Sequence, residues 1–194
     1  MKQSAVFLDR DGVINPDPGF INDPDDLVLY PYTAEAIRKF NSMGFKVLVV
    51  TNQSGIARGL ISVNQLENIH NTMISRLKKQ NAYIDKIYYS PYHIKGNMPS
   101  YNVQHIDRKP EIGMFKKACS DFELDPSMSY MIGDRLSDMI FAHRAGLTPI
   151  LVFTGDGKDD LLKMVADKSD FMPKYVAQDI LAASWLIESL KKER

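Results

Sequence analysis

The sequence predicts an α/β protein with a three-layer Rossmann-like fold, in which a mostly parallel central sheet carries helices on both faces and no large cap domain is added. Short apolar runs of strand length alternate with amphipathic segments of helix length, and this alternation requires crossover connections between parallel strands. The run Lys46–Thr51 is apolar almost throughout, as is typical of strands buried on both faces. We expect the 194 residues, 1–194, to form a single domain.

The composition is that of a soluble globular protein and argues against several other classes. Hydrophobic residues make up 44% and charged residues 25% of the chain, and 24 basic residues balance 24 acidic ones. This balance argues against nucleic acid or a membrane surface as a partner. Cys119 is the only cysteine, so a disulfide within the chain is not possible. Because we find no signal peptide and no transmembrane run, we expect a cytoplasmic protein, and we expect it to be a monomer.

The first predicted strand, Ser4–Leu8, ends at two aspartates and a glycine, Asp9, Asp11 and Gly12. Side chains at positions i and i+2 of an extended chain point the same way, so the two carboxylates should leave the strand side by side. Such a pair repels unless a cation lies nearby or one carboxyl group keeps a proton. Taken alone, an ordinary Asp-Gly turn explains these residues equally well.

The other strands are predicted from short apolar runs at Lys46–Thr51, Lys86–Tyr89, Ser129–Ile132 and Thr148–Phe153, with a short edge strand at Phe171–Met172. The helices are predicted from apolar residues at three- and four-residue spacing over Thr33–Met43, Ser62–Gln80, Glu111–Phe122, a segment ending at Gly146, and Ala177–Lys192. Long loops at 15–32 and 90–107 connect these elements, and loops of this length in a compact domain are usually functional.

Local signals predict several helix ends. Thr33 is a candidate N-cap, and Gly44 supplies the left-handed residue that ends the same helix. Ser62 and Gln65 have the spacing of a capping box. Pro110 suits the first turn of the helix that follows it.

Two potentially reactive side chains are assigned to the core. His70 lies on the apolar face of the predicted helix 62–80, so we interpret it as a buried core histidine rather than a ligand. Cys119 lies beside Phe115 and Phe122 in the sequence and is interpreted as a small core residue.

Polar residues follow strand after strand: Asp9 and Asp11, then Thr51 and Asn52, then Asp134 and Asp138, with Arg108 and Lys109 just before a helix. In open parallel sheets, ligands bind outside the carboxyl ends of the strands. Aspartates there can hold Mg²⁺, and hydroxyl, backbone N–H and ammonium groups suit phosphate oxygens. One of the carboxylates can also attack phosphorus. The pattern predicts a site for phosphoryl transfer.

Four motifs, in order and spread over Val6 to Phe153, resemble those of the haloacid-dehalogenase phosphohydrolases. More narrowly, they resemble the family of D-glycero-D-manno-heptose 1,7-bisphosphate 7-phosphatases and histidinol-phosphatases. The motifs are Asp9-Arg10-Asp11-Gly12, Thr51-Asn52-Gln53-Ser54-Gly55-Ile56-Ala57-Arg58-Gly59, Arg108-Lys109-Pro110, and Gly133-Asp134 with Asp138.

The resemblance implies a role for each catalytic residue. Asp9 is the nucleophile, and Asp11 is the general acid that protonates the leaving sugar oxygen and then the base that activates water. Asp9, Asp134 and the backbone carbonyl of Asp11 hold Mg²⁺, while Thr51 and Lys109 stabilise the phosphoryl group.

Two further sets of roles follow from the same resemblance. Asp138 orients Lys109 or a metal-bound water. Arg58 and Arg108 are candidates to clamp the phosphate that is not transferred, although a solvated loop position explains Arg58 equally well. The full set of predicted substrate contacts is Asp17, Phe20, Thr51, Asn52, Gln53, Ser54, Arg58, Arg108, Lys109 and Arg135.

One departure from the family concerns zinc. The related enzymes commonly hold a structural zinc through Cys-x-His and Cys-x-Cys in the loop after the third strand. The corresponding residues here are Ser90, Tyr92, His105 and Asp107, with His93 adjacent. Zinc strongly prefers Cys and His, so we do not expect a structural zinc.

The sequence therefore predicts a Mg²⁺-dependent phosphatase that acts on a small phosphorylated sugar, with heptose 1,7-bisphosphate losing its 7-phosphate as the leading substrate. Histidinol phosphate is the alternative within the same class. A polynucleotide 3′-phosphatase is less well supported because no basic groove is evident. A non-catalytic phosphosugar-binding module is the alternative from a different class, and the intact pair Asp9 and Asp11 argues against it.

Overall fold

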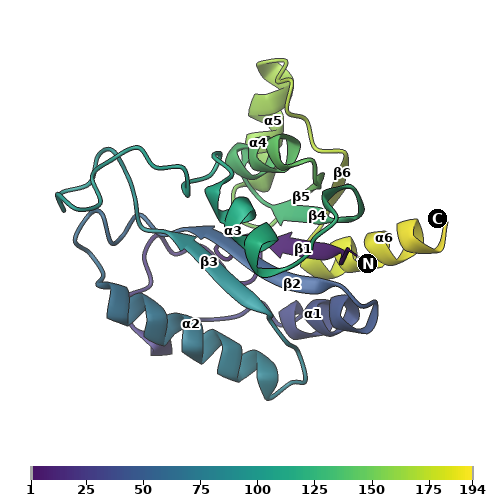
Figure 1. Cartoon of the computed structure of the whole chain (residues 1–194), viewed down its shortest axis with the longest axis horizontal. Coiled ribbons are helices and arrows are strands. Elements are labelled where there is room, and N and C mark those ends of the chain that lie inside the picture. The colour runs from purple at the N-terminus through teal and green to yellow at the C-terminus, as the bar shows by residue number, and fades with distance from the viewer. Residues whose placement is uncertain (1, 194) are drawn as a thin grey trace.

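The computed structural model describes residues 2–193. Its strands are β1 (Ala5–Leu8), β2 (Lys46–Asn52), β3 (Lys86–Ser90), β4 (Tyr130–Gly133), β5 (Thr148–Val152) and β6 (Tyr175–Ala177). They form one sheet in the order β3-β2-β1-β4-β5-β6, and every neighbouring pair is parallel. Figure 1 shows the sheet between two layers of helices, which confirms the predicted α/β fold.

The side chains of β1 divide the core into two parts. Val6 and Leu8 pack in the same cluster as residues of α1 (Thr33–Ser42), α2 (Val63–Lys78) and α6 (Ile180–Lys192). Ala5 and Phe7 point to the other face, where α3 (Gly113–Asp121) and α4 (Leu136–Ala145) pack. This alternation follows from the two-residue period of a strand. No helix among residues 2–193 is long and apolar enough to cross a membrane.

The central strands end in register at one edge of the sheet. Leu8 pairs with Val49 of β2 and with Ile132 of β4, so the residues after these positions emerge side by side. The connection from β1 to α1 contains one short 3₁₀ helix, Pro24–Asp26, and the connection from β3 to α3 contains no helix or strand in the described chain. These two long connections leave the carboxyl ends of β1 and β3.

Three helices begin at other residues than the sequence predicts. Thr33 is the first residue of α1 rather than its cap, because its hydroxyl donates to the Ile14 carbonyl at 2.8 Å. Helix α3 begins at Gly113 instead of Glu111, because the Glu111 N–H closes a turn onto the Arg108 carbonyl. Helix α6 begins at Ile180, because the residues before it form β6. The capping box of α2 and the left-handed Gly44 are confirmed.

The segment after β5 also differs from prediction. Helix α5 (Gly157–Ala166) was not predicted, and the edge strand is Tyr175–Ala177 rather than Phe171–Met172. The Phe171 ring packs instead edge-on against His143, with centroids 5.7 Å apart. Cys119 is exposed, so its assignment to the core was wrong. It follows the buried Ala118 on α3 and is rotated onto the outer face by the helical period.

Candidate active site

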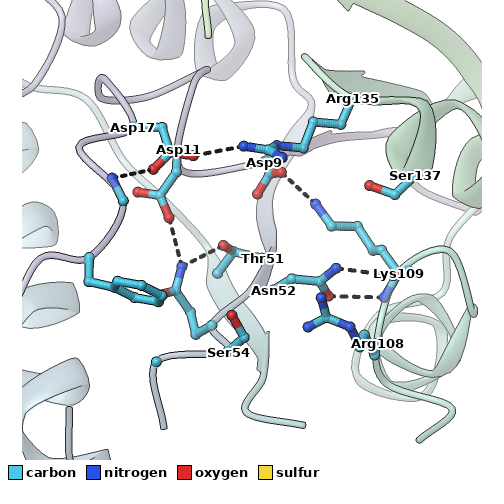
Figure 2. Close-up of a pocket in the computed structure, with 14 residues that line it drawn as sticks. Asp9, Asp11, Asp17, Thr51, Asn52, Ser54, Arg108, Lys109, Arg135 and Ser137 are labelled. Carbon is cyan, nitrogen blue, oxygen red and sulfur yellow. Dashed lines mark hydrogen bonds and ion pairs between the residues drawn. The ribbon is translucent and has the colours of Figure 1, made fainter. Parts of the chain in front are cut away.

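A cavity of about 380 Å³ opens at the carboxyl edge of the sheet (Figure 2). Its lining is mostly polar and comes from the loops after β1, β2 and β4 and from the turn before α3. The lining residues are Asp9, Asp11, Asp17, Gly19, Phe20, Thr51, Asn52, Gln53, Ser54, Gly55, Arg108, Lys109, Arg135 and Ser137. The structure thus brings together every predicted substrate contact except Arg58. Asp134 is fully buried and does not line the cavity.

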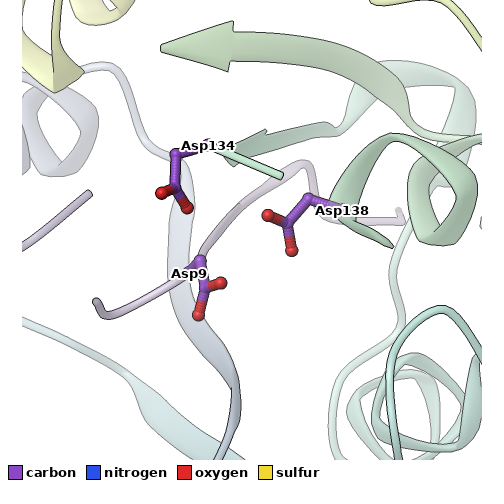
Figure 3. A group of neighbouring side chains, drawn as sticks. All are labelled: Asp9, Asp134 and Asp138. Atoms are coloured by element: carbon purple, nitrogen blue, oxygen red, sulfur yellow. The ribbon is translucent and has the colours of Figure 1, made fainter. Parts of the chain in front are cut away.

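Three carboxylates meet beside this cavity (Figure 3). Asp9, Asp134 and Asp138 each present an oxygen within 4.8 Å of the other two. Burial, together with the neighbouring Asp138, raises the pKa of Asp9 to about 6 against the lowering effect of Lys109. Burial and the two other carboxylates raise the pKa of Asp134 to about 8. If all three carboxyl groups were ionised, the cluster would therefore carry more negative charge than its buried surroundings favour.

The same carboxylates fit a magnesium ion. Asp134 Oδ2 accepts the Asp156 N–H at 2.9 Å, but Asp134 Oδ1 is buried without a hydrogen-bond partner. Buried carboxylate oxygens in a cluster are the hard ligands that Mg²⁺ takes, and a cation there would relieve their repulsion. Asp11 faces the cavity, but its carboxylate is not part of the cluster.

Lys109 supplies the positive charge that faces these carboxylates. Its Nζ lies 2.8 Å from Asp9 Oδ2 and 2.6 Å from Asp138 Oδ1. Burial alone would lower the pKa of Lys109, but Asp138 and Asp9 outweigh burial and hold this pKa above its ordinary value. Asn52 fixes the Lys109 backbone from the other side, accepting its N–H and donating to its carbonyl, both at 3.0 Å. The Asn52 amide therefore positions Lys109.

Glycines allow the strand ends to approach Asp134 and Asp138 closely. A Cβ atom at Gly12 would lie 2.2 Å from Asp134 Oδ2, and one at Gly155 would lie 2.0 Å from the same oxygen. Both glycines have a positive φ, +80° and +57°. A Cβ at Gly133 would meet Asp138 Cβ at 2.3 Å. Any side chain at these positions would displace the carboxylates.

Asp11 is held by four donors. Arg10 Nε and Nη2 contact the two oxygens of Asp11 at 3.0 and 2.7 Å. Asn15 Nδ2 donates to Asp11 Oδ1 at 2.8 Å, and Gln53 Nε2 donates to Asp11 Oδ2 at 2.9 Å. Gln53 also donates to Thr51 Oγ1 at 2.9 Å, so the two predicted catalytic side chains are linked through one amide.

Residues that the sequence did not single out complete the site. Arg10 and Asn15 hold Asp11, and the Asp156 N–H binds Asp134. Asp156 also pairs with Arg135 Nη2 at 2.7 Å, and the same nitrogen lies 2.9 Å from Asp17 Oδ2. A signal was present for Asp156, because it follows a predicted parallel strand at the same edge as the other aspartates.

Two arginines, Arg58 and Arg108, have no carboxylate partner within residues 2–193, and Arg108 lines the cavity. Burial and then the charge of Arg58 lower the pKa of Arg108. Arg108 Nη1 donates to the Tyr92 carbonyl at 2.9 Å. Arg58 Nε is buried with no hydrogen-bond partner, and neither arginine forms an ion pair within residues 2–193. The pair could hold an anionic group.

Ring stacking and an ion pair with α3 help to hold the loop from 91 to 112. The rings of Tyr92 and His105 stack at 3.8 Å and 17°, and Tyr101 packs on Tyr92 at 5.9 Å. Asp107 Oδ2 lies 2.5 Å from Lys117 Nζ. Aromatic packing therefore orders part of the loop in which the family resemblance places zinc ligands.

Comparison with known proteins gives consistent results. Residues 106–183 match a family model described as HAD-hydrolase-like. A D-glycero-beta-D-manno-heptose-1,7-bisphosphate 7-phosphatase from Rhodopseudomonas palustris is 37% identical over 84% of this chain and 91% of its own. One from Haemophilus ducreyi is 40% identical over 80% of this chain and 86% of its own. The crystal structure of D,D-heptose 1,7-bisphosphate phosphatase from B. bronchiseptica, complexed with magnesium and phosphate, is 30% identical, covering 99% of this chain and 100% of that chain with a TM-score of 0.83.

Proposed function

The chain belongs to the haloacid-dehalogenase-like phosphatases, and from that membership we propose that it removes the 7-phosphate of D-glycero-D-manno-heptose 1,7-bisphosphate with Mg²⁺ as its cofactor. One observation carries the proposal. Asp9, a carboxylate able to attack phosphorus, borders the polar cavity of about 380 Å³ and lies close to Lys109 and the buried Asp134. The names of the related proteins support heptose bisphosphate as the substrate.

In the first proposed step, a carboxylate oxygen of Asp9 forms a bond to phosphorus and the bond from phosphorus to the sugar oxygen breaks. Protonated Asp11 gives its proton to that oxygen as it leaves. A water oxygen then attacks the phosphorus of the aspartyl-phosphate and the water gives a proton to Asp11. The bond from phosphorus to the Asp9 oxygen breaks, so phosphate is released and the Asp9 carboxylate is restored. Lys109 and Thr51 bind the phosphoryl oxygens throughout. Bound through Asp9, Asp134 and the Asp11 carbonyl, Mg²⁺ would supply further positive charge to these oxygens.

The second phosphate of the substrate requires a separate cationic group. Arg58 and Arg108 supply it in this proposal, because the pair has no carboxylate to neutralise it. Guanidinium matches phosphate in a bidentate manner and remains charged at all relevant pH values. The paired arginines favour a bisphosphate over histidinol phosphate, which carries a single phosphate.

The proposal is tested by measuring phosphate release from a panel of substrates. The panel contains heptose 1,7-bisphosphate, histidinol phosphate and a 3′-phosphorylated oligonucleotide, each with Mg²⁺ and with excess chelator. We expect the highest kcat/KM for heptose 1,7-bisphosphate and loss of turnover in chelator. A higher value for either other substrate would refute the proposed specificity.

The nucleophile is tested by Asp9→Asn. We expect this variant to lose turnover while it still binds the bisphosphate in calorimetry, since the amide keeps the shape but cannot attack phosphorus. Unchanged turnover would exclude Asp9 as the nucleophile. Asp179→Asn is the matched control, because Asp179 caps α6 through the Ala182 N–H and does not line the cavity.

A further inference from the structure

A buried chain of contacts leads from α2 to Asp11. Arg10 is only 2% exposed and uses Nε and Nη2 to contact both oxygens of Asp11. Its remaining terminal nitrogen, Nη1, lies 3.3 Å from Nε2 of His70, which is 6% exposed. The prediction that His70 is a buried core histidine is confirmed, but its ring also contacts the residue that holds Asp11.

The direction of this hydrogen bond follows from the chemistry of the two groups. Guanidinium nitrogens only donate, so Nε2 of His70 must accept. Burial and the adjacent Arg10 lower the pKa of His70 to about 3, so the ring is neutral at physiological pH. A neutral ring that accepts at Nε2 carries its proton on Nδ1. His70 therefore satisfies Nη1 of Arg10 without adding charge beside the site.

Arg10 depends on this acceptor. A buried guanidinium nitrogen that loses its partner keeps its desolvation cost, so the side chain would turn toward another acceptor. Such a turn would break the planar two-point contact with Asp11, because Nε, Nη1 and Nη2 lie in one rigid plane. The His70 ring is itself fixed on α2 and packs against Tyr89, with centroids 5.8 Å apart.

We propose that His70 is a positioning residue for leaving-group protonation, acting through Arg10 to hold the Asp11 carboxyl group in one orientation toward the leaving oxygen. This inference rests on the proposed function. As the phosphorus–oxygen bond breaks, its electron pair goes to the leaving oxygen, which takes the proton of Asp11. The two-point contact from Arg10 fixes the plane of the Asp11 carboxyl group, so the proton is delivered to the leaving oxygen from one fixed position.

The dependence on the leaving group separates this role from a purely structural one. A sugar alkoxide is a poor leaving group and needs the proton, whereas p-nitrophenolate is stable as an anion and does not. The experiment measures kcat/KM, which covers the steps up to leaving-group departure, for p-nitrophenyl phosphate and for the sugar phosphate of the panel that the unaltered protein hydrolyses best.

In His70→Leu we expect kcat/KM for the sugar phosphate to fall about tenfold, a part of the roughly 10²–10⁴-fold that general acid catalysis supplies. For p-nitrophenyl phosphate we expect a change of less than about twofold, since no proton transfer is required. His70→Gln should restore most of the loss, because its amide oxygen can accept from Arg10. Arg10→Lys keeps the charge but not the two-point contact, so it should show the same selective loss as His70→Leu.

Each result bears on the inference. Equal losses on both substrates in His70→Leu and Arg10→Lys, or no loss on either, would overturn it, and so would failure of His70→Gln to restore activity while its melting temperature is normal. If His70→Leu does not fold, Arg10→Lys and His70→Gln decide the question. If the unaltered protein hydrolyses p-nitrophenyl phosphate but no sugar phosphate, the proposed function fails and the inference fails with it.

Discussion

At the scale of single residues, Lys109 determines the charge balance of the site. Its ammonium group lies between Asp9 and Asp138, and all three side chains are almost completely buried. Burying an ammonium group is costly unless its partners are close and well placed. Here the carboxylates of Asp9 and Asp138 both pair with the Lys109 ammonium group. Asp138 is therefore placed to orient Lys109, one of the two roles that the resemblance implies, while Asp134 Oδ1 has no hydrogen-bond partner and could bind a cation.

Replacing Asp138 with Asn should reveal this division of roles. The amide can still accept from the Arg135 N–H, as Asp138 Oδ2 does at 3.1 Å, but it no longer neutralises Lys109. We expect kcat to fall about tenfold or more and the free energy of unfolding to fall by about 1–3 kcal/mol, less than for a fully broken buried pair because Asp9 remains. Steady-state kinetics and urea denaturation provide the measurements. A variant with unchanged kcat would show that Asp138 does not position Lys109.

Arg108 provides a residue-scale test of how the second phosphate is bound. In Arg108→Ala we expect KM for heptose 1,7-bisphosphate to rise about tenfold, equivalent to about 1.4 kcal/mol of binding, with a much smaller rise for a monophosphate. Arg144→Ala is the control, because Arg144 pairs with Glu111 on the surface and does not line the cavity. Equal increases in KM for both substrates would remove Arg108 from a phosphate clamp.

At the scale of elements, the site is built from the turns that leave parallel strands. The turns after β1 and β5 converge on Asp134 through Gly12 and Gly155. The Asp156 N–H then binds Asp134 from the start of the turn into α5. This arrangement explains why glycine occurs at positions 12 and 155 of these turns.

Gly155→Ala should therefore impair the metal site, whereas Gly44→Ala should not. Both glycines have a positive φ, +57° and +81°, so alanine should cost each variant about 1–2 kcal/mol of stability. Only the alanine at 155 would meet Asp134, since a Cβ at Gly44 has no atom within 4 Å. We expect weaker Mg²⁺ binding by calorimetry and lower kcat for Gly155→Ala alone. Similar activity in the two variants would contradict this account.

The elements that sequence patterns predicted well are those whose signal is local. The capping box of Ser62 and Gln65 needs only three residues of helix, and it is present. Thr33 failed as a cap because a distant partner, the Ile14 carbonyl, takes its hydroxyl. Helix α5 lacked a signal because it buries little apolar surface: Leu162 is 68% exposed and only Gly157 and Met164 are buried.

The same distinction applies to the site. The positions of Asp9 and Asp134 could be predicted because each follows a recognisable strand at the same edge of the sheet. The contact between His70 and Arg10 could not, because it joins residues 60 positions apart through the packing of α2. Sequence periodicity identified His70 as buried but could not identify what its ring contacts.

At the scale of the whole molecule, the buried carboxylates link stability to pH. The pKa of Asp134 is raised to about 8 in the folded protein from 3.8, so between these values the folded state binds more protons than the unfolded state. The free energy of unfolding of the metal-free protein must therefore fall as pH rises toward 8. His70 acts in the opposite direction, since its pKa is lowered to about 3 from 6.5, and its contribution is complete above about pH 6.5.

The interval from pH 6.5 to 8.5 thus isolates the effect of Asp134. In excess chelator we expect stability to fall by about 1–2 kcal/mol across this interval, because each unit of pKa difference corresponds to about 1.4 kcal/mol. In a chain of this size that loss lowers Tm by roughly 2–8 °C. Saturating Mg²⁺ should reverse the trend, since the ion binds the ionised carboxylate and binds more tightly as pH rises. Asp134→Asn should remove both the fall in chelator and the gain with Mg²⁺. Scanning calorimetry provides the measurement, and a Tm that rises with pH in chelator would show that Asp134 is ionised in the folded, metal-free protein.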